Sequence, residues 1–354
     1  MKKKNVVFLA MAAVLIPFTA ATGCSKKGEE KKPLTLYTWA EMFPEDILEG
    51  FTRDTGIAVN YVNFDTDETM LTKLQTANGG DYDLIIADDY IIETAIAEGL
   101  VQKLDKSKLP NYGNINPLYQ KPFYDPQDEY TVPYGAGVVT LVYDPGRVST
   151  PIQGYAGLWD PSLRGNIGIL GNYRVINGMA LKVLGQSYNT NDIALIRQAG
   201  ELLLELAPNI RLIRDDFLQD ELLSGEIAAA VMYTSQATAA KLANPGLEVV
   251  VFPSEGIGFG IMGSFIPSKA PNAYAAYAFL NYILDPERGA ACFEYLGYYS
   301  TFSASDPYIS DEYKPFLTLP AGFNRNMEMI QNIGAEAVEE HSLIWTAFRD
   351  RAGQ

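Results

Sequence analysis

Apolar residues along the chain follow two alternating spacings, which predict strands that alternate with helices. The apolar run Leu34 to Thr38 is typical of a short buried strand, and the segment that begins at Pro44 carries apolar residues on one helical face and ends at Gly56. The same pattern predicts strands at 57–62 and 82–87, a helix through Met70 that ends near Gly79, and a helix at about 90–99. Such alternation favours a parallel α/β sheet.

A second stretch of the same kind begins after Tyr143. Its pattern predicts helices at 178–184 and 192–206, strands at 227–233 and 247–252, and a helical stretch at 273–296 that Asp285-Pro286 divides. Chains longer than about 250–300 residues usually split into domains. The sequence therefore predicts two α/β lobes.

The first residues predict export. Three lysines at positions 2–4 precede an apolar run from Val6 to Ala21, and small residues lead into Cys24, as in a cleaved secretory signal. The apolar run is shorter than the 20 or so residues that span a membrane. We therefore expect residues 1–23 to be a signal peptide and Cys24 to carry a lipid; the alternative is an uncleaved anchor or a plain signal peptide in which the cysteine is incidental. Residues 24–33 would then be a lipidated cysteine followed by a charged tether.

Net charge and the numbers of cysteine and histidine residues limit the ligands that the chain can bind. The net charge is −16, which argues against a nucleic-acid partner and suits a cationic ligand. Once Cys24 is lipidated, Cys292 is the one remaining cysteine, so we expect no disulfide. The single histidine, His341, cannot supply a metal site by itself, and we expect it at the surface or capping a helix, with no metal or other cofactor.

Catalytic and nucleotide-binding motifs are weak. Gly258-x-Gly260-x-x-Gly263 matches a dinucleotide pattern, but an extended run closed by Pro267 follows it where a helix should begin. We interpret this segment as a strand that crosses between the lobes. One histidine does not allow a convincing Ser/His or Cys/His pair, and an acid-pair glycosidase rests on the abundance of Asp and Glu alone, so we do not expect an enzyme.

Several segments resemble the spermidine/putrescine-binding proteins of polyamine ABC importers, over essentially the whole chain after the tether. They include Leu36-Tyr37-Thr38-Trp39-Ala40-Glu41, Asp67-Glu68-Thr69-Met70, Tyr82-Asp83-Leu84-Ile85, residues 128–134 and Leu158-Trp159-Asp160-Pro161. The resemblance implies a two-lobed periplasmic-binding-protein fold of the α/β class. Crossover strands near 131–143 and 249–266 would join the lobes, with a ligand cleft between them. We expect lobe 1 at 34–138 and 265–310, and lobe 2 at 139–264 and 311–354.

The same resemblance implies a function. The chain would be an extracytoplasmic, membrane-anchored lipoprotein, a monomer that binds putrescine or spermidine and delivers it to an inner-membrane ABC permease. Alternatives stay open: another small amine, a ferric ion bound through the adjacent Tyr298 and Tyr299, or, with less support, an enzyme on the same fold.

Site residues come from the resemblance and from position in the sheet. Ligands of open α/β sheets bind beyond the carboxyl ends of the strands, which here are 39–42 and 88–90. The expected ligand-binding residues are Trp39, Glu41, Asp88, Tyr90, Asn172, Tyr233, Tyr298 and Gln331, with Ala40, Met42, Val175, Gly260 and Met262 at further ligand-facing positions.

Charge balance singles out Asp88. Positions where the resembled family carries acids are Asn172, Val175 and Met262 here, while Asp88 stands at a family serine position. A buried ammonium needs a charged or polar partner, so we expect Asp88 to hold it. The aromatic residues would pack the carbon chain. In the alternative interpretation, Asp88 caps the helix that follows.

Overall fold

Three parallel strands form the core of the first lobe, as the apolar pattern predicts. β1 (Leu34–Thr38) lies between β2 (Val59–Asn63) and β3 (Leu84–Asp88). The strands are connected through α1 (Glu45–Thr55) and α2 (Asp67–Thr76), and α3 (Asp89–Ala97) follows β3. Gly56 ends α1 in a left-handed conformation with φ 70°, which glycine adopts without steric cost, and its N–H bonds to the carbonyl of Thr52.

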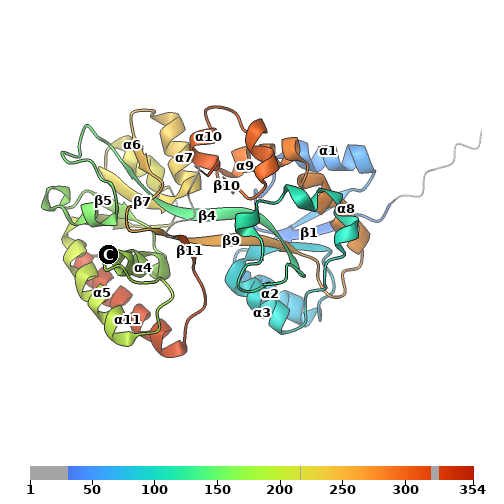
Figure 1. Cartoon of the computed structure of the whole chain (residues 1–354), viewed down its shortest axis with the longest axis horizontal. Coiled ribbons are helices and arrows are strands. Elements are labelled where there is room, and N and C mark those ends of the chain that lie inside the picture. Colours follow the sequence, from blue (N-terminus) through green and yellow to red (C-terminus); the bar gives the residue numbers. More distant parts are fainter. Residues whose placement is uncertain (1–30, 216, 320–326) are drawn as a thin grey trace, which may run out of the picture. The chain divides into compact units, whose positions relative to one another are not determined.

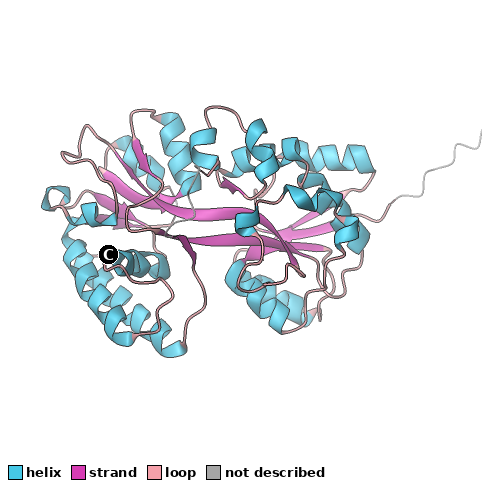
Figure 2. Cartoon of the chain, in the orientation of Figure 1, coloured by secondary structure: helices cyan, strands magenta, loops and turns pink. Residues whose placement is uncertain are grey.

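The computed structural model describes residues 31–215, 217–319 and 327–354 (Figures 1 and 2). The predicted signal peptide and Cys24 lie outside these ranges. Within them, no helix combines the length and the hydropathy needed to cross a membrane.

Two long antiparallel strands join the lobes; the first spans the predicted residues, and the second begins later than the predicted 249. β4 (Thr131–Tyr143) pairs with β9 (Ile257–Phe265) in its first half and with β7 in its second half. The sheet order is β2-β1-β3-β9-β4-β7-β5-β6, so β9 and β4 occupy its centre (Figure 1). Gly258, Gly260 and Gly263 lie inside β9, and no helix begins there, in agreement with the interpretation as a crossover strand.

The second lobe repeats the α/β arrangement. Its strands are β5 (Ile167–Ile169), β6 (Ile210–Ile213), β7 (Ala229–Tyr233) and β8 (Glu248–Val250), and its helices are α4 (Tyr173–Val183), α5 (Ile193–Leu206), α6 (Leu218–Ser224), α7 (Thr234–Ala243) and α11 (Ala335–Ala352). α4 begins five residues before the predicted start because the Asn172 side chain accepts the backbone N–H groups of Arg174 and Val175 and caps the helix.

The chain returns to the first lobe through α8 (Ala273–Ile283) and α9 (Pro286–Leu296). Asp285 caps α9 and Pro286 takes its first position, which explains the predicted break. β10 (Tyr299–Ser300) and α10 (Lys314–Leu317) follow, and β11 (Met327–Met329) pairs in parallel with β9. Leu317 packs in the first-lobe core, so the crossing into the second lobe comes later than the expected residue 311.

Short 3-10 helices complete the described elements: Lys106–Lys108, Pro110–Asn114, Pro117–Tyr119, Tyr155–Trp159, Pro161–Leu163, Ala207–Asn209 and Ser303–Tyr308.

Each lobe has its own core. In the first lobe, Leu36 and Phe279 pack on one face of the sheet, and Ile85 and Phe265 pack on the other. A separate large cluster fills the second lobe. A small group that includes Val138 and Ile261 packs along β4 and β9 between them. Two cores joined by two strands allow the lobes to move as rigid bodies.

His341 corrects one sequence expectation. We expected a surface or capping histidine, but α11 packs against α4 and α5, and His341 is 1% exposed. The Asn177 side-chain amide lies 3.1 Å from His341 Nδ1 and donates to the His341 carbonyl at 2.9 Å. Burial lowers the pKa of His341 to about 4, so the ring is neutral at physiological pH.

Candidate ligand-binding site

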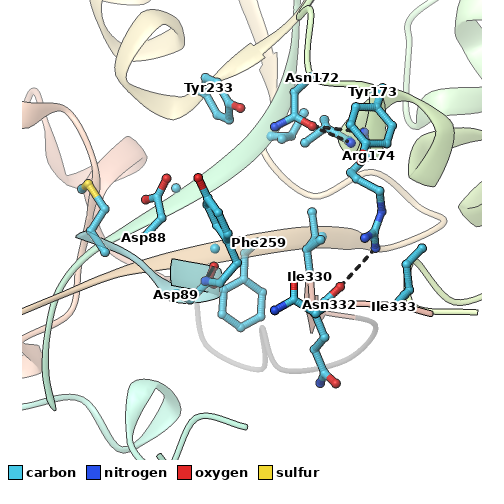
Figure 3. Close-up of a pocket in the computed structure, with 18 of the residues that line it drawn as sticks. Asp88, Asp89, Asn172, Tyr173, Arg174, Tyr233, Phe259, Ile330, Asn332 and Ile333 are labelled. Carbon is cyan, nitrogen blue, oxygen red and sulfur yellow. Dashed lines mark hydrogen bonds between the residues drawn. The ribbon is translucent and has the colours of Figure 1, made fainter. Parts of the chain in front are cut away.

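A cavity of about 870 Å³ lies between the two lobes (Figure 3). The first lobe lines it with residues that follow β1 and β3 and precede β10. The second lobe lines it with the first turn of α4, the end of β7 and the segment after β11. The cavity therefore lies beyond the carboxyl ends of β1 and β3, where ligands of open α/β sheets bind.

Asp88 points into this cavity. It takes the N-cap position of α3, yet its side chain makes no capping hydrogen bond. Figure 3 shows its carboxylate directed towards the side of the cavity that Tyr233 occupies. The backbone thus agrees with the capping interpretation, whereas the side chain does not cap α3; it lines the cavity and also interacts with the Asp67 carboxyl.

Further carboxyl groups surround Asp88. Asp89 accepts the backbone N–H groups of Ile261 at 3.1 Å and Tyr90 at 2.8 Å. The Tyr90 hydroxyl lies 3.3 Å from an Asp67 carboxylate oxygen and 3.0 Å from one of Glu68. Asp67, Glu68, Asp88 and Asp89 form no ion pair with any residue that the structure describes. We refer to these four residues as the acidic cluster.

The three aspartates of the acidic cluster are costly to ionise. Burial, with a further contribution from the charges of Asp67 and Asp89, raises the pKa of Asp88 well above its ordinary value. Burial also raises the pKa of Asp67 to about 6 and that of Asp89 to about 7. A bound cation would favour the ionised carboxylates and relieve this cost. The first-lobe end of the cavity is therefore suited to an ammonium group.

Aromatic side chains provide apolar surface next to the acidic cluster. Trp39 packs on Phe64 with ring centroids 4.9 Å apart, and Tyr90, Tyr233 and Tyr298 also line the cavity. Burial raises the pKa of Tyr298, and its hydroxyl interacts with Ser235 of the second lobe. Burial also raises the pKa of Tyr233, so both phenols are neutral at physiological pH. Neutral rings can pack a methylene chain and present their faces to an ammonium.

The second-lobe wall differs from the first. Asn172 and Val175 line it, but the side-chain oxygen of Asn172 accepts the backbone N–H groups of Arg174 and Val175 and caps α4. Arg174 contributes the charge on this wall, and Figure 3 shows its guanidinium directed towards the segment that holds Asn332. The Asn332 amide in turn donates to Glu93 of α3, so the lobes touch beside the cavity.

Most of the expected site residues line the cavity: Trp39, Met42, Asp88, Tyr90, Asn172, Val175, Tyr233, Gly260, Met262, Tyr298 and Gln331. Glu41 and Ala40 do not. Glu41 has a left-handed backbone, with φ 58°, and an exposed side chain.

The strand alternation after residue 298 explains why Tyr299 is buried away from the cavity, near Phe252.

Tyr298 and Tyr299 therefore do not face a common ligand, as a ferric site at this pair would require. Among the described residues, no group of three His, Cys, Asp or Glu side chains is placed to hold a metal ion.

Some lining residues were missed. Glu68, Asp89, Tyr173, Arg174, Phe259 and Asn332 line the cavity but were not among the expected ligand-binding residues. Two of them left a signal in the sequence, because Glu68 lies in a segment that carries the resemblance and Asp89 adjoins Asp88. Arg174 left no comparable signal, because its place in the first turn of α4 becomes clear only in the structure.

The comparisons with known proteins agree with this architecture. Residues 46–318 match the model of the bacterial extracellular solute-binding protein family. The chain is 32% identical over 339 residues to the spermidine/putrescine-binding periplasmic protein of Escherichia coli strain K12, with 95% of each chain covered. It is 29% identical over 302 residues to the putrescine-binding periplasmic protein PotF of that strain, which covers 80% of this chain and 81% of PotF.

A solved structure gives the same fold. The substrate-binding protein PotD of a spermidine/putrescine ABC transporter from Streptococcus pneumoniae, in complex with calcium and HEPES, superposes with a TM-score of 0.83. The two sequences are 27% identical, and the alignment covers 91% of this chain and 100% of PotD.

Proposed function

Because the chain belongs to the bacterial extracellular solute-binding protein family, we propose that it is the extracytoplasmic binding component of an ABC importer and carries a polyamine, putrescine or spermidine, in the cavity between its lobes. The relatives named above are binding proteins for these amines. The observation that carries the proposal is the acidic cluster: Glu68, Asp88 and Asp89 line the cavity, and no member of the cluster has a cationic partner among the described residues.

Binding by this site divides between charge and apolar contact. The Asp88 carboxylate pairs with the ammonium and accepts its hydrogen bonds, and Asp89 and Glu68 lie near it. Trp39 and Tyr298 cover the methylene chain, and Tyr233 approaches from the second lobe. A cation over an aromatic ring contributes about 0.5–2 kcal/mol, and a hydrogen bond to a charged group contributes about 1.5–3 kcal/mol. Together they favour a small amine over a neutral solute of the same size.

Delivery follows from closure of the lobes. Ligand contacts from both walls would stabilise the arrangement in which Asn332 meets Glu93 and Tyr298 meets Ser235. The closed monomer would then dock on an inner-membrane ABC permease. We assign lobe 1 to residues 34–138 and 265–317, and lobe 2 to 139–264 and the chain from β11 onward.

Export and anchoring complete the proposal. The lysines at 2–4, the apolar run and the small residues before Cys24 support cleavage of a signal peptide and attachment of a lipid at Cys24. The charged residues 25–33 would hold the binding lobes away from the membrane surface.

A thermal-shift panel tests the proposed function. Putrescine, spermidine, neutral amino acids and ferric ion are added separately to the protein, because a ligand that binds only the folded state raises the melting temperature by mass action. We expect the amines to raise it, by an amount that grows with concentration, and ferric ion to leave it unchanged. No shift with any amine would contradict the proposal.

A further inference from the structure

The two ends of the cavity carry opposite charge. Asp88, Asp89 and Glu68 line the first-lobe end, whereas none of the described second-lobe residues that line the cavity is acidic. Asp215 lies beside this wall, but its carboxylate accepts the Gly171 N–H at 2.9 Å and does not line the cavity. The charged side chain that does line the second-lobe wall is Arg174.

The position of Arg174 adds to the positive potential. It lies in the first turn of α4, a turn without acidic residues, and residues 172–175 of this turn all line the cavity. The N-terminus of a helix carries a partial positive charge, so a basic side chain there is unfavourable unless an anion is near. The helix and the guanidinium therefore both favour an anionic group at this end.

The Arg174 guanidinium retains donors for such a group. Its Nη2 donates to the carbonyl oxygens of Tyr188 at 3.2 Å and Gln331 at 3.3 Å. Its Nε is buried and has no hydrogen-bond partner in the described part of the chain, and Arg174 forms no ion pair there. Burial lowers the pKa of Arg174, as expected for an uncompensated cation. A guanidinium has five N–H donors, and carboxylates match their geometry.

A diamine leaves its second charge without a partner here. If one ammonium binds at Asp88, a second ammonium that reaches the α4 wall meets the neutral side chains of Asn172 and Val175 and the positive charge of Arg174. Like charges at close range are unfavourable, more so where water is excluded. A carboxylate in the same place would be attracted.

We propose that Arg174 and the first turn of α4 form a carboxylate subsite, so that the cavity prefers an ω-amino acid, with its ammonium at Asp88 and its carboxylate at Arg174. This inference rests on the proposed function for the ammonium end. It changes only the chemical group at the other end of the ligand.

Calorimetric titration with two ligands of equal chain length tests the inference. Putrescine and 4-aminobutanoate each have a four-carbon chain with an ammonium at one end, and they differ in the group at the other end. We expect 4-aminobutanoate to bind at least tenfold more tightly than putrescine. Equal affinity, or tighter binding of putrescine, overturns the inference and leaves the proposed function standing. No binding of either ligand overturns both.

Substitution of Arg174 locates the subsite. Arg174→Gln should reduce the ratio of the two affinities at least tenfold, because it removes the charge that separates the ligands. Arg197→Gln serves as the matched control, since Arg197 is an exposed arginine of the same lobe that pairs with Glu340; its ratio should stay at the wild-type value. An unchanged ratio in Arg174→Gln overturns the inference.

A measurement on the wild type keeps the test decisive if Arg174→Gln does not fold. 4-Aminobutanamide replaces the carboxylate with a neutral group of the same shape. We expect it to bind at least tenfold less tightly than 4-aminobutanoate. An amide that binds as well as the acid overturns the carboxylate subsite.

Discussion

At the scale of single residues, Asp88 should oppose the stability of the empty protein. Because the pKa of Asp88 is raised in the folded protein, folding favours the protonated carboxyl. The folded protein is therefore most stable at low pH and loses this stability as the pH rises through the folded-state pKa. Asp88→Asn should therefore melt about 2 °C or more above the wild type near pH 7.5, the shift expected for about 1 kcal/mol in a protein of this size. The difference should shrink towards pH 4. Scanning calorimetry of the ligand-free proteins measures it.

Asp311→Asn is the control for this substitution. Asp311 is exposed, and its contact with Lys314 lowers its pKa, so the variant should gain no stability at pH 7.5. An Asp88→Asn variant that melts at or below the wild-type temperature near neutral pH would show that Asp88 is not an uncompensated buried charge.

Single residues also show which parts of the site could be predicted from the sequence and which could not. That Asp88 and the aromatic residues line the cavity could be predicted, because the ends of strands locate the cavity and the resemblance names these positions. Their contacts with an ammonium remain a prediction. The positions of Arg174 and His341 could not be predicted. Whether a polar side chain is buried depends on which helices pack together, and the packing of α11 on α4 is not visible in either local pattern.

At the scale of elements, Asn177 should hold α4 to α11. Asn177→Ala removes both contacts of its amide with His341 and leaves the buried histidine without that partner. Loss of a buried hydrogen-bond partner costs about 1–3 kcal/mol of unfolding free energy. Urea unfolding should show a lower midpoint with an unchanged slope.

Asn60→Ala is the comparison for this prediction. Asn60 is exposed on β2, and a surface substitution of this kind changes stability by about 0.5 kcal/mol or less. If Asn177→Ala unfolds at the same urea concentration as Asn60→Ala, the Asn177–His341 contact does not connect the helices.

Element boundaries were predictable to different degrees. α1 and the break between α8 and α9 followed from glycine and proline, whose backbone preferences are local. The start of α4 was placed too late, because its cap is an asparagine bond that becomes evident only with the backbone in place. The crossing after residue 310 was also placed too early, since the burial of Leu317 depends on the distant first-lobe core.

At the scale of the whole molecule, ligand should draw the lobes together. β4 and β9 connect two separate cores, and a ligand that contacts both walls favours the closed arrangement. Small-angle scattering with saturating ligand should give a smaller radius of gyration than the empty protein. Asp88→Asn should need at least tenfold more ligand than the wild type to reach the smaller radius. An unchanged radius in a wild-type sample with demonstrated binding would argue against closure.

The N-terminal region carries a separate prediction. If Cys24 bears the lipid, Cys24→Ala should move the protein from the membrane fraction to the soluble fraction, and mass spectrometry should show the loss of the acyl mass. Cys292→Ala is the control, because Cys292 is buried in the first lobe. A Cys24→Ala protein that stays with the membrane and keeps its lipid would contradict anchoring at this residue.

The central claim is that the Asp88 carboxylate receives the ammonium of a bound amine, and calorimetric titration of putrescine against wild type and Asp88→Asn tests it most directly. We expect the wild type to bind and the variant to bind at least tenfold more weakly, which corresponds to about 1.4 kcal/mol. Because Asn caps a helix about as well as Asp, a capping role alone would leave affinity unchanged. Equal affinity in the two proteins, or no binding by the wild type, would contradict the account.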